Sequence, residues 1–420
     1  MKLDSSQNKL QKLLEFLVFS SILIYTLINL RYGLTVLLDS SYFGIIIEQS
    51  LVALLLVVQI YILLTRKFSP YVYLYLLIVF WHISLWVVKG YGARLVWQAI
   101  SNDGIFLIFI AWLETFEWKR RSVIKVLFFA SILHILFILL EYFGFIASSI
   151  DKFSLYGDSN PEMGYRYGAL FAAPGVLALY SVMVAIYAAA DFKISRDYLS
   201  ISLLVLSLML GLFSGNRSFV LATFIGLSIV YFWRPRFSNY KKVSFSYRSF
   251  FFTCALILLI VPFLIFQEEL FFLFARFEWE VLATDANTRL YGRAGSIPAL
   301  QSLLSYDSIF GTTYLDPFTL KDSVSYNGQI ITLSNSYSSM LVTRGWLFGS
   351  VTLLIYLGAI LKYRRISKHA KSSDISIIGS CMYFALLGSG IVLFFDNLIY
   401  SQIFVVASML AYSSTFRRCS

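Results

Sequence analysis

Five arginines are the residues of this sequence whose type and placement suggest chemistry most directly. They lie in segments that the order of the apolar runs assigns to the outer face of a membrane protein: Arg166, Arg217, Arg289, Arg293 and Arg344. Membrane proteins keep positive charge mainly on the cytoplasmic side, and a guanidinium binds phosphate through two parallel N–H groups. The five arginines therefore predict a site for an anionic ligand on the outer face. The structural alternative for each is a side chain that reaches the lipid headgroups or pairs with a carboxylate.

Two of these arginines stand at the expected outer ends of membrane helices. Arg166 lies in 164–175 (GYRYGALFAAPG), and Arg217 lies in 214–218 (SGNRS). A helix N-terminus favours an anion because its first N–H groups are free and the helix dipole is positive there. Arg289 and Arg293 are four residues apart, so on a helix they would share one face.

The apolar content of the chain identifies the elements that must hold these arginines. Of the 420 residues, 59% are hydrophobic and 14% are charged, whereas soluble proteins have about 25% charged residues. Apolar runs of about 20 residues recur along the whole length, as in a bundle of membrane helices. We predict an all-α, polytopic integral membrane protein in which residues 1–420 form a single transmembrane domain of about 12 helices. The expected spans are 13–33, 44–64, 70–88, 95–113, 122–146, 169–190, 198–214, 217–233, 250–267, 339–361, 375–395 and 397–415.

The distribution of basic residues predicts the orientation. With both termini in the cytoplasm, 23 of the 34 Lys and Arg residues fall on the cytoplasmic side and 11 on the outer side, which is the usual bias. The net charge of +11 then serves mainly to anchor the protein at the membrane surface. A nucleic-acid partner is not expected, whereas the lipid bilayer is.

Two long segments are predicted outside the membrane. The smaller loop is 147–168, and the larger is 268–338, between the ninth and tenth helices. A loop of this length usually carries structure or function. Leu270–Leu282 and Arg293–Tyr306 are expected to be short helices, so the large loop is predicted to be partly helical, while 311–333 reads as turns.

Several kinds of chemistry are not expected. The histidines, His82, His134 and His369, fall within spans or in a cytoplasmic loop, and the three cysteines have no metal-ligand spacing. No metal site, cofactor or Ser/His/Asp triad is therefore predicted on the outer face. Glu141, near the outer end of the fifth span, either holds an arginine in place or is a water-exposed helix end.

Four segments resemble motifs of the O-antigen ligase/polymerase superfamily. Arg166, Gly168, Phe171 and Pro174 resemble its R-x-x-G-x-F-x-x-P-N element, with Gly175 in place of the Asn. The segment 214–218 resembles S-x-S-R, which gives Arg217 the arginine role, and 288–311 resembles a loop element that gives Arg289 a second arginine role, although its Trp is missing.

The fourth segment resembles H-N-x-Y-L-x-x-L-x-x-x-G-x-x-G through Asn335, Tyr337, Leu341, Gly345 and Gly349. Ser334 stands where the ligases have a His that is regarded as catalytic. This difference favours the O-antigen polymerase (Wzy) branch and leaves the general base open.

The resemblance implies a membrane glycosyltransferase of the GT-C type in the bacterial inner membrane, with its active site in the periplasm. Its donor and acceptor would be glycans linked to undecaprenyl pyrophosphate, which it would join without a metal. Arg166, Arg217 and Arg289 would bind the pyrophosphate, supported by Arg293, Arg344, Asn335, Tyr337 and Glu141. The general base is unknown, and the outer carboxylates that could serve are Glu162, Glu280 and Asp285.

The alternatives are a ligase that transfers finished polymer to lipid A-core, and a transporter that flips lipid-linked oligosaccharides. The second is less favoured because the sequence has no internal repeat, which transporters often show. The resemblance leaves open whether a chain-length regulator protein binds this chain.

Overall fold

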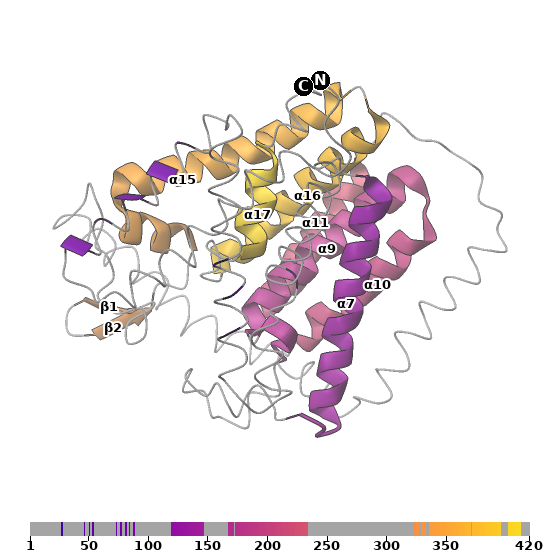
Figure 1. Ribbon diagram of the computed structural model, residues 1–420, viewed down its shortest axis with the longest axis horizontal. Helices are drawn as coiled ribbons and strands as arrows, with labels where there is room; N and C mark the ends of the chain where they lie inside the picture. Colours follow the sequence, from indigo (N-terminus) through magenta and orange to yellow (C-terminus); the bar gives the residue numbers. More distant parts are fainter. Residues whose placement is uncertain are drawn as a thin grey trace, which may run out of the picture.

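The computed structural model describes isolated positions between 27 and 88 and the ranges 119–146, 167–171, 173–233, 323–326, 329–332, 336–370, 372–395 and 402–412. The described part is helical apart from one short hairpin (Figure 1). Its elements are α7 (Arg120–Tyr142), η5 (Ala169–Phe171), α9 (Pro174–Ser195), α10 (Tyr198–Phe213), α11 (Arg217–Phe232), β1 (Ser323–Tyr326), β2 (Gln329–Thr332), α15 (Ser336–His369), α16 (Ser373–Phe395) and α17 (Gln402–Leu410).

Four helices are long and apolar enough to cross a membrane: Arg120–Tyr142, Pro174–Ser195, Trp346–His369 and Ser373–Leu393. The prediction of a helical membrane protein is therefore confirmed for the described residues, whereas the count of twelve helices extends beyond them. Helices α10 and α11 have 16 residues each, which corresponds to about 24 Å and falls short of a bilayer core of about 30 Å.

Helices α7, α9, α10 and α11 alternate in direction. The start of α7 meets the end of α9 and the start of α10, because Arg120 binds Asp191 and Asp197. The end of α11 lies there too, since the Lys193 ammonium donates to the Val230 carbonyl at 2.7 Å. We call this the Arg120 end of the bundle, and the opposite end, where α11 begins, the Arg217 end.

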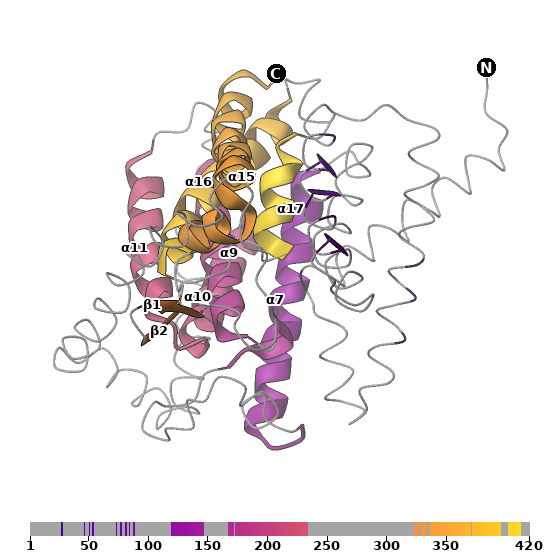
Figure 2. The same ribbon diagram turned by 90° about the vertical axis from the view of Figure 1, so that its left-hand side faces the viewer.

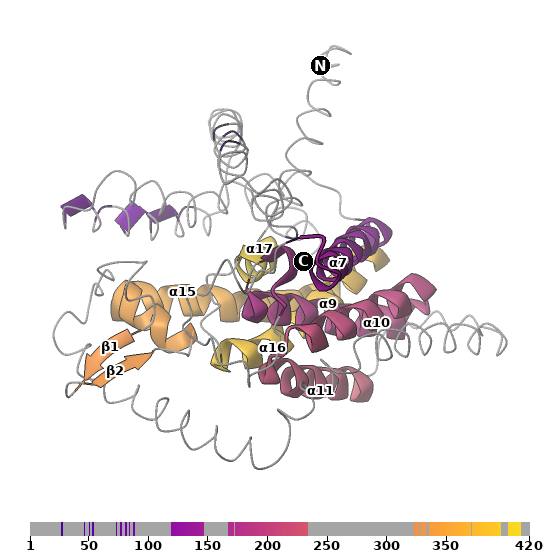
Figure 3. The same ribbon diagram turned by 90° about the horizontal axis from the view of Figure 1, so that it is seen from below.

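Helix α9 is the centre of the bundle. It lies among α7, α10, α11 and α16 (Figure 3). In its most apolar 18 residues 78% are buried, whereas the value for α7 is 33%. A helix surrounded by other helices is apolar on all sides, as α9 is. Ile186 of α9 sits between two glycines: a Cβ would lie 2.2 Å from the Ile186 Cδ1 at Gly226 and 2.0 Å from it at Gly388. Glycine thus allows α11 and α16 to approach α9 closely.

Helix α15, in which the sequence predicts the span 339–361, is sharply bent near its start. A Cβ on Gly349 would lie 3.0 Å from the Leu341 Cα, although eight residues of straight helix would separate these positions by about 12 Å. The first turns of α15 therefore fold back on the rest of the helix (Figure 1). The stretch of α15 that is long and apolar enough to cross a membrane includes Trp346–His369.

The prediction of turns for 311–333 was wrong in its second half. Strands β1 and β2 pair in antiparallel register, with Tyr326 opposite Gln329 and Ser323 opposite Thr332. The two residues between the strands are Asn and Gly, which is the strongest sequence signal for a tight hairpin. The abundance of turn-forming residues around it hid this signal.

Candidate functional site

The segment that follows Arg166 is packed against the end of α10. The backbone N–H of Tyr167 donates to the Phe213 carbonyl at 3.1 Å, and the two rings meet edge to face with centroids 6.1 Å apart. Tyr167 is 7% exposed. This contact brings the first arginine motif next to the connection that leads into α11 and the second motif. Arg166 itself lies outside the described residues.

The backbone of this segment has an uncommon shape. Ala169 has a φ of +47°, in the left-handed region that costs about 1–2 kcal/mol for a residue with a Cβ. In the family element the glycine stands three positions after the arginine, and that position is occupied here by Ala169 rather than by Gly168. The conformation that glycine favours is therefore present at the glycine position of the motif, although this chain has an alanine there.

The first turn of α9 is set by its sequence. The Phe171 N–H donates to the Gly168 carbonyl at 3.1 Å, which closes the short η5 helix, and α9 begins five residues later than the predicted start at 169, with Pro174 in its first turn. Proline suits this place because its fixed φ is helical and it has no N–H to satisfy. Ala173, the N-cap residue of α9, makes no side-chain hydrogen bond to the N–H groups of the first turn.

The connection from α10 to α11 is tied together by its own side chains. Gly215 has a φ of +57°, and the Ser214 hydroxyl donates to the Gly211 carbonyl at 2.6 Å. The Asn216 Oδ1 accepts from the Ser218 N–H at 3.0 Å and from the Ser218 hydroxyl at 2.8 Å. Asn216 is therefore the N-cap of a helix whose first residue is Arg217.

This cap corrects the expectation of wholly free N–H groups at the start of α11. Because the Asn216 side chain already accepts from the Ser218 N–H, an anion at this helix start would depend more on the Arg217 guanidinium and the helix dipole. The position of Arg217 as the first residue of α11 agrees with the prediction.

Tyr337 and Glu141 are the two predicted supporting residues whose side chains are described. The Tyr337 hydroxyl donates to the Gly390 carbonyl of α16 at 3.0 Å, and burial raises the pKa of Tyr337, so the phenol stays protonated as a donor. Glu141 is 7% exposed, and the alternative of a water-exposed helix end is therefore wrong.

Residues 167–171, which directly follow Arg166, lie deeper in the bundle than the last turn of α7. The ring of Phe171 lies 4.4 Å from that of His134, yet α7 continues for eight more residues to Tyr142, or about 12 Å. Figure 2 shows α7 protruding beyond α9, α10 and α11 at this end.

Most of the other predicted site residues lie outside the described part of the chain, and Arg217 and Arg344 are described there only as helical positions without their side chains. The residues outside it are Glu162, Arg166, Glu280, Asp285, Arg289, Arg293 and Asn335. Among the described residues, no three His, Cys, Asp or Glu side chains gather to hold a metal ion.

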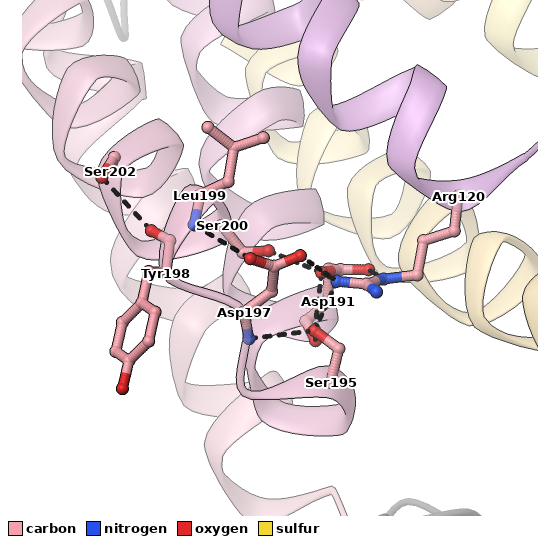
Figure 4. Close-up of polar contacts among 8 residues, drawn as sticks. All are labelled: Arg120, Asp191, Ser195, Asp197, Tyr198, Leu199, Ser200 and Ser202. Atoms are coloured by element: carbon pink, nitrogen blue, oxygen red, sulfur yellow. Dashed lines mark hydrogen bonds and ion pairs between the residues drawn. The ribbon is translucent and has the colours of Figure 1, made fainter. Parts of the chain in front are cut away.

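The Arg120 end holds a buried ion-pair network that sequence reasoning missed (Figure 4). Arg120 binds both carboxylate oxygens of Asp191, at 2.6 and 2.8 Å, and also Ser195 at 2.7 Å and Asp197 at 3.0 Å. The Ser200 hydroxyl donates to Asp191 at 2.6 Å. The network joins α7, α9 and α10, and its chemistry is structural, because every charge in it is paired.

No protein-family model and no curated protein matches this chain. The resemblance to the O-antigen ligase/polymerase superfamily therefore rests on the four motif segments of the sequence.

Proposed function

We propose that this protein polymerises oligosaccharide repeat units linked to undecaprenyl pyrophosphate, on the periplasmic face of the bacterial inner membrane. The product would be an O-antigen or a related surface polysaccharide. The observation that carries the proposal is the hydrogen bond from the Tyr167 N–H to the Phe213 carbonyl at 3.1 Å. It joins the segment 164–175, which resembles one arginine motif of the superfamily, to the residue directly before 214–218, which resembles another, and its two partners lie 46 positions apart in the chain.

A second observation supports the family resemblance. The left-handed conformation of Ala169, with a φ of +47°, falls on the position where the family element has a glycine. A backbone shape that favours glycine, found at the glycine position of the element, supports the resemblance in addition to the residue identities.

The proposed reaction joins two lipid-linked glycans. A hydroxyl of the acceptor repeat unit attacks the anomeric carbon of the donor sugar, and the bond from that carbon to the pyrophosphate oxygen breaks. The hydroxyl proton passes to a general base, for which Glu162, Glu280 and Asp285 are the candidates. Undecaprenyl pyrophosphate leaves with the bonding electrons.

The arginines would provide most of the rate acceleration. Negative charge grows on the pyrophosphate as the bond breaks, and fixed cations stabilise that charge in the transition state. We assign this role to Arg166, Arg217 and Arg289, with the 268–338 loop carrying Arg289 to the other two. The position of residues 167–171, deeper in the bundle than the last turn of α7, suits a substrate whose prenyl chain lies in the bilayer and whose pyrophosphate lies near the membrane surface.

Complementation of a strain that lacks this gene tests the proposal. Loss of the protein should leave single repeat units on the lipid anchor, whereas loss of a ligase would leave long polymer that is not transferred to lipid A-core. Arg217→Ala should fail to restore the polymer ladder, and Arg217→Lys should restore it in part because a point charge lacks the planar fork.

Arg364→Ala is the matched control, since Arg364 is an exposed arginine near the end of α15 and should complement fully. Normal polymer length with Arg217→Ala would contradict the anion-binding role, and the reading of an interfacial arginine would then be preferred.

A further inference from the structure

Three aromatic rings from α7, η5 and α9 form a cluster in which His134 and Tyr180 are buried and Phe171, from the residues that follow Arg166, is partly buried. The His134 ring lies 4.4 Å from the Phe171 ring and 5.2 Å from the Tyr180 ring, measured between centroids. The Phe171 and Tyr180 rings are 5.5 Å apart. We call His134, Phe171 and Tyr180 the three-ring cluster.

The cluster is anchored on both of its helices and on a distant part of the chain. The His134 Nε2 lies 2.8 Å from the Leu27 carbonyl oxygen, and since a carbonyl only accepts, Nε2 carries the hydrogen. The Tyr180 hydroxyl lies 2.9 Å from that of Ser131. His134 is completely buried, so its ring is held in one place and contributes one hydrogen bond and its flat face.

Residues 167–171 are thereby held at two points. The Tyr167 N–H is bonded to the end of α10, and the Phe171 ring packs against the His134 ring, with the two planes tilted by 31°. Between them, Ala169 is held in its left-handed conformation. A backbone in such a conformation persists only where its surroundings determine it. The ring of His134 is one contact through which α7 holds residues 167–171 in place.

We propose that His134 is a positioning residue that fixes the backbone of 167–171, the residues directly after Arg166, by holding Phe171. This inference rests on the proposed function, because Arg166 acts there on the donor pyrophosphate. His134 does not touch the substrate itself, being wholly buried. Its effect passes along the five residues from Phe171 back to Arg166, so the property that matters is the ring face rather than the ability to carry a proton.

Two substitutions separate the ring from the hydrogen bond. His134→Gln keeps an N–H for the Leu27 carbonyl and loses the ring, whereas His134→Phe keeps the ring and loses the N–H. With purified protein and a lipid-linked repeat unit, His134→Gln should raise the KM for the donor and lower kcat/KM by about 10- to 100-fold, as expected when a charged group is misplaced. His134→Phe should keep most of the activity.

A double-mutant cycle tests whether His134 acts through Phe171. Phe171→Leu should resemble His134→Gln, and the double variant should be no worse than the poorer single variant, because both remove the same contact. Phe137→Leu removes another buried ring of α7 and should leave the KM unchanged. Thermal unfolding of each variant in detergent shows whether the protein that was assayed is folded.

The outcomes distinguish the two proposals. Independent, multiplying effects of His134→Gln and Phe171→Leu would overturn the positioning role, as would equal damage from His134→Phe and His134→Gln. A change confined to thermal stability, with KM and kcat unaltered, would leave His134 a purely structural residue. If the wild-type protein neither forms polymer nor binds undecaprenyl pyrophosphate in detergent, the proposed function itself fails.

Discussion

The ion pair between Arg120 and Asp191 gives the sharpest prediction about stability. The Asp191 side chain is completely buried and that of Arg120 is 12% exposed. Arg120→Ala removes both bonds to the Asp191 carboxylate, at 2.6 and 2.8 Å, and among the described residues leaves this anion the hydroxyls of Ser195 and Ser200. Breaking one side of a buried ion pair costs about 3–5 kcal/mol, because the remaining charge has lost its compensation.

Reversible unfolding in mixed detergent and SDS micelles measures this loss. The double substitution Arg120→Met with Asp191→Leu should recover most of the stability, since replacing a whole buried pair by apolar residues is often neutral. Asp197→Asn is the control: its side chain is 29% exposed and asparagine can also cap α10, so the loss should stay below about 1 kcal/mol. If Arg120→Ala is no more harmful than Asp197→Asn, the network does not hold α7 to α9 and α10.

Four further predictions concern separate parts of the protein. Gly226→Ala should destabilise the protein by about 1–3 kcal/mol through overpacking, since its Cβ would lie 2.2 Å from the Ile186 Cδ1; combined with Ile186→Ala, unfolding should show no further loss beyond that of Ile186→Ala alone. Ala169→Gly should raise stability by up to about 1 kcal/mol by relieving the left-handed conformation, and unchanged or lower stability in the same unfolding assay would contradict this account. A reporter fused within 268–338 should be active in the periplasm and one fused within 234–249 or 362–374 in the cytoplasm; a cytoplasmic signal from 268–338 would reverse the whole assignment of the site. Polymer formation by the purified protein should survive EDTA, and loss that a divalent cation restores would show that a metal, and not arginine, balances the pyrophosphate charge.

The positions where some helices begin and end could be predicted closely from the sequence. The predicted spans 198–214 and 217–233 agree closely with α10 and α11, because the signals that end and begin these helices lie within a few residues of each other. Asp197 and Asn216 each cap the helix that follows. Such bonds depend only on neighbouring residues.

Other local features were present in the sequence but misjudged. The Asn-Gly pair between β1 and β2 is a hairpin signal that was read as part of a turn-rich stretch. The start of α9 was placed five residues early, because 169–173 is apolar enough to continue a membrane span, whereas the left-handed Ala169 and Pro174 in the first turn set the helix to begin later.

Composition and the pattern of apolar runs indicated a helical membrane protein and the helices that can cross a membrane. The order of residues in the chain identified the segments that carry the arginines. Tertiary structure alone decided which of those segments meet. The Tyr167 bond to Phe213, the packing of the Phe171 ring against His134 and the pairing of Arg120 with Asp191, 71 residues away, all depend on how α7, α9 and α10 pack. The sequence pattern shows that a helix surface is apolar but does not say which neighbouring helix it packs against. Only the close packing of whole helices, with glycine where backbones approach, selects one arrangement.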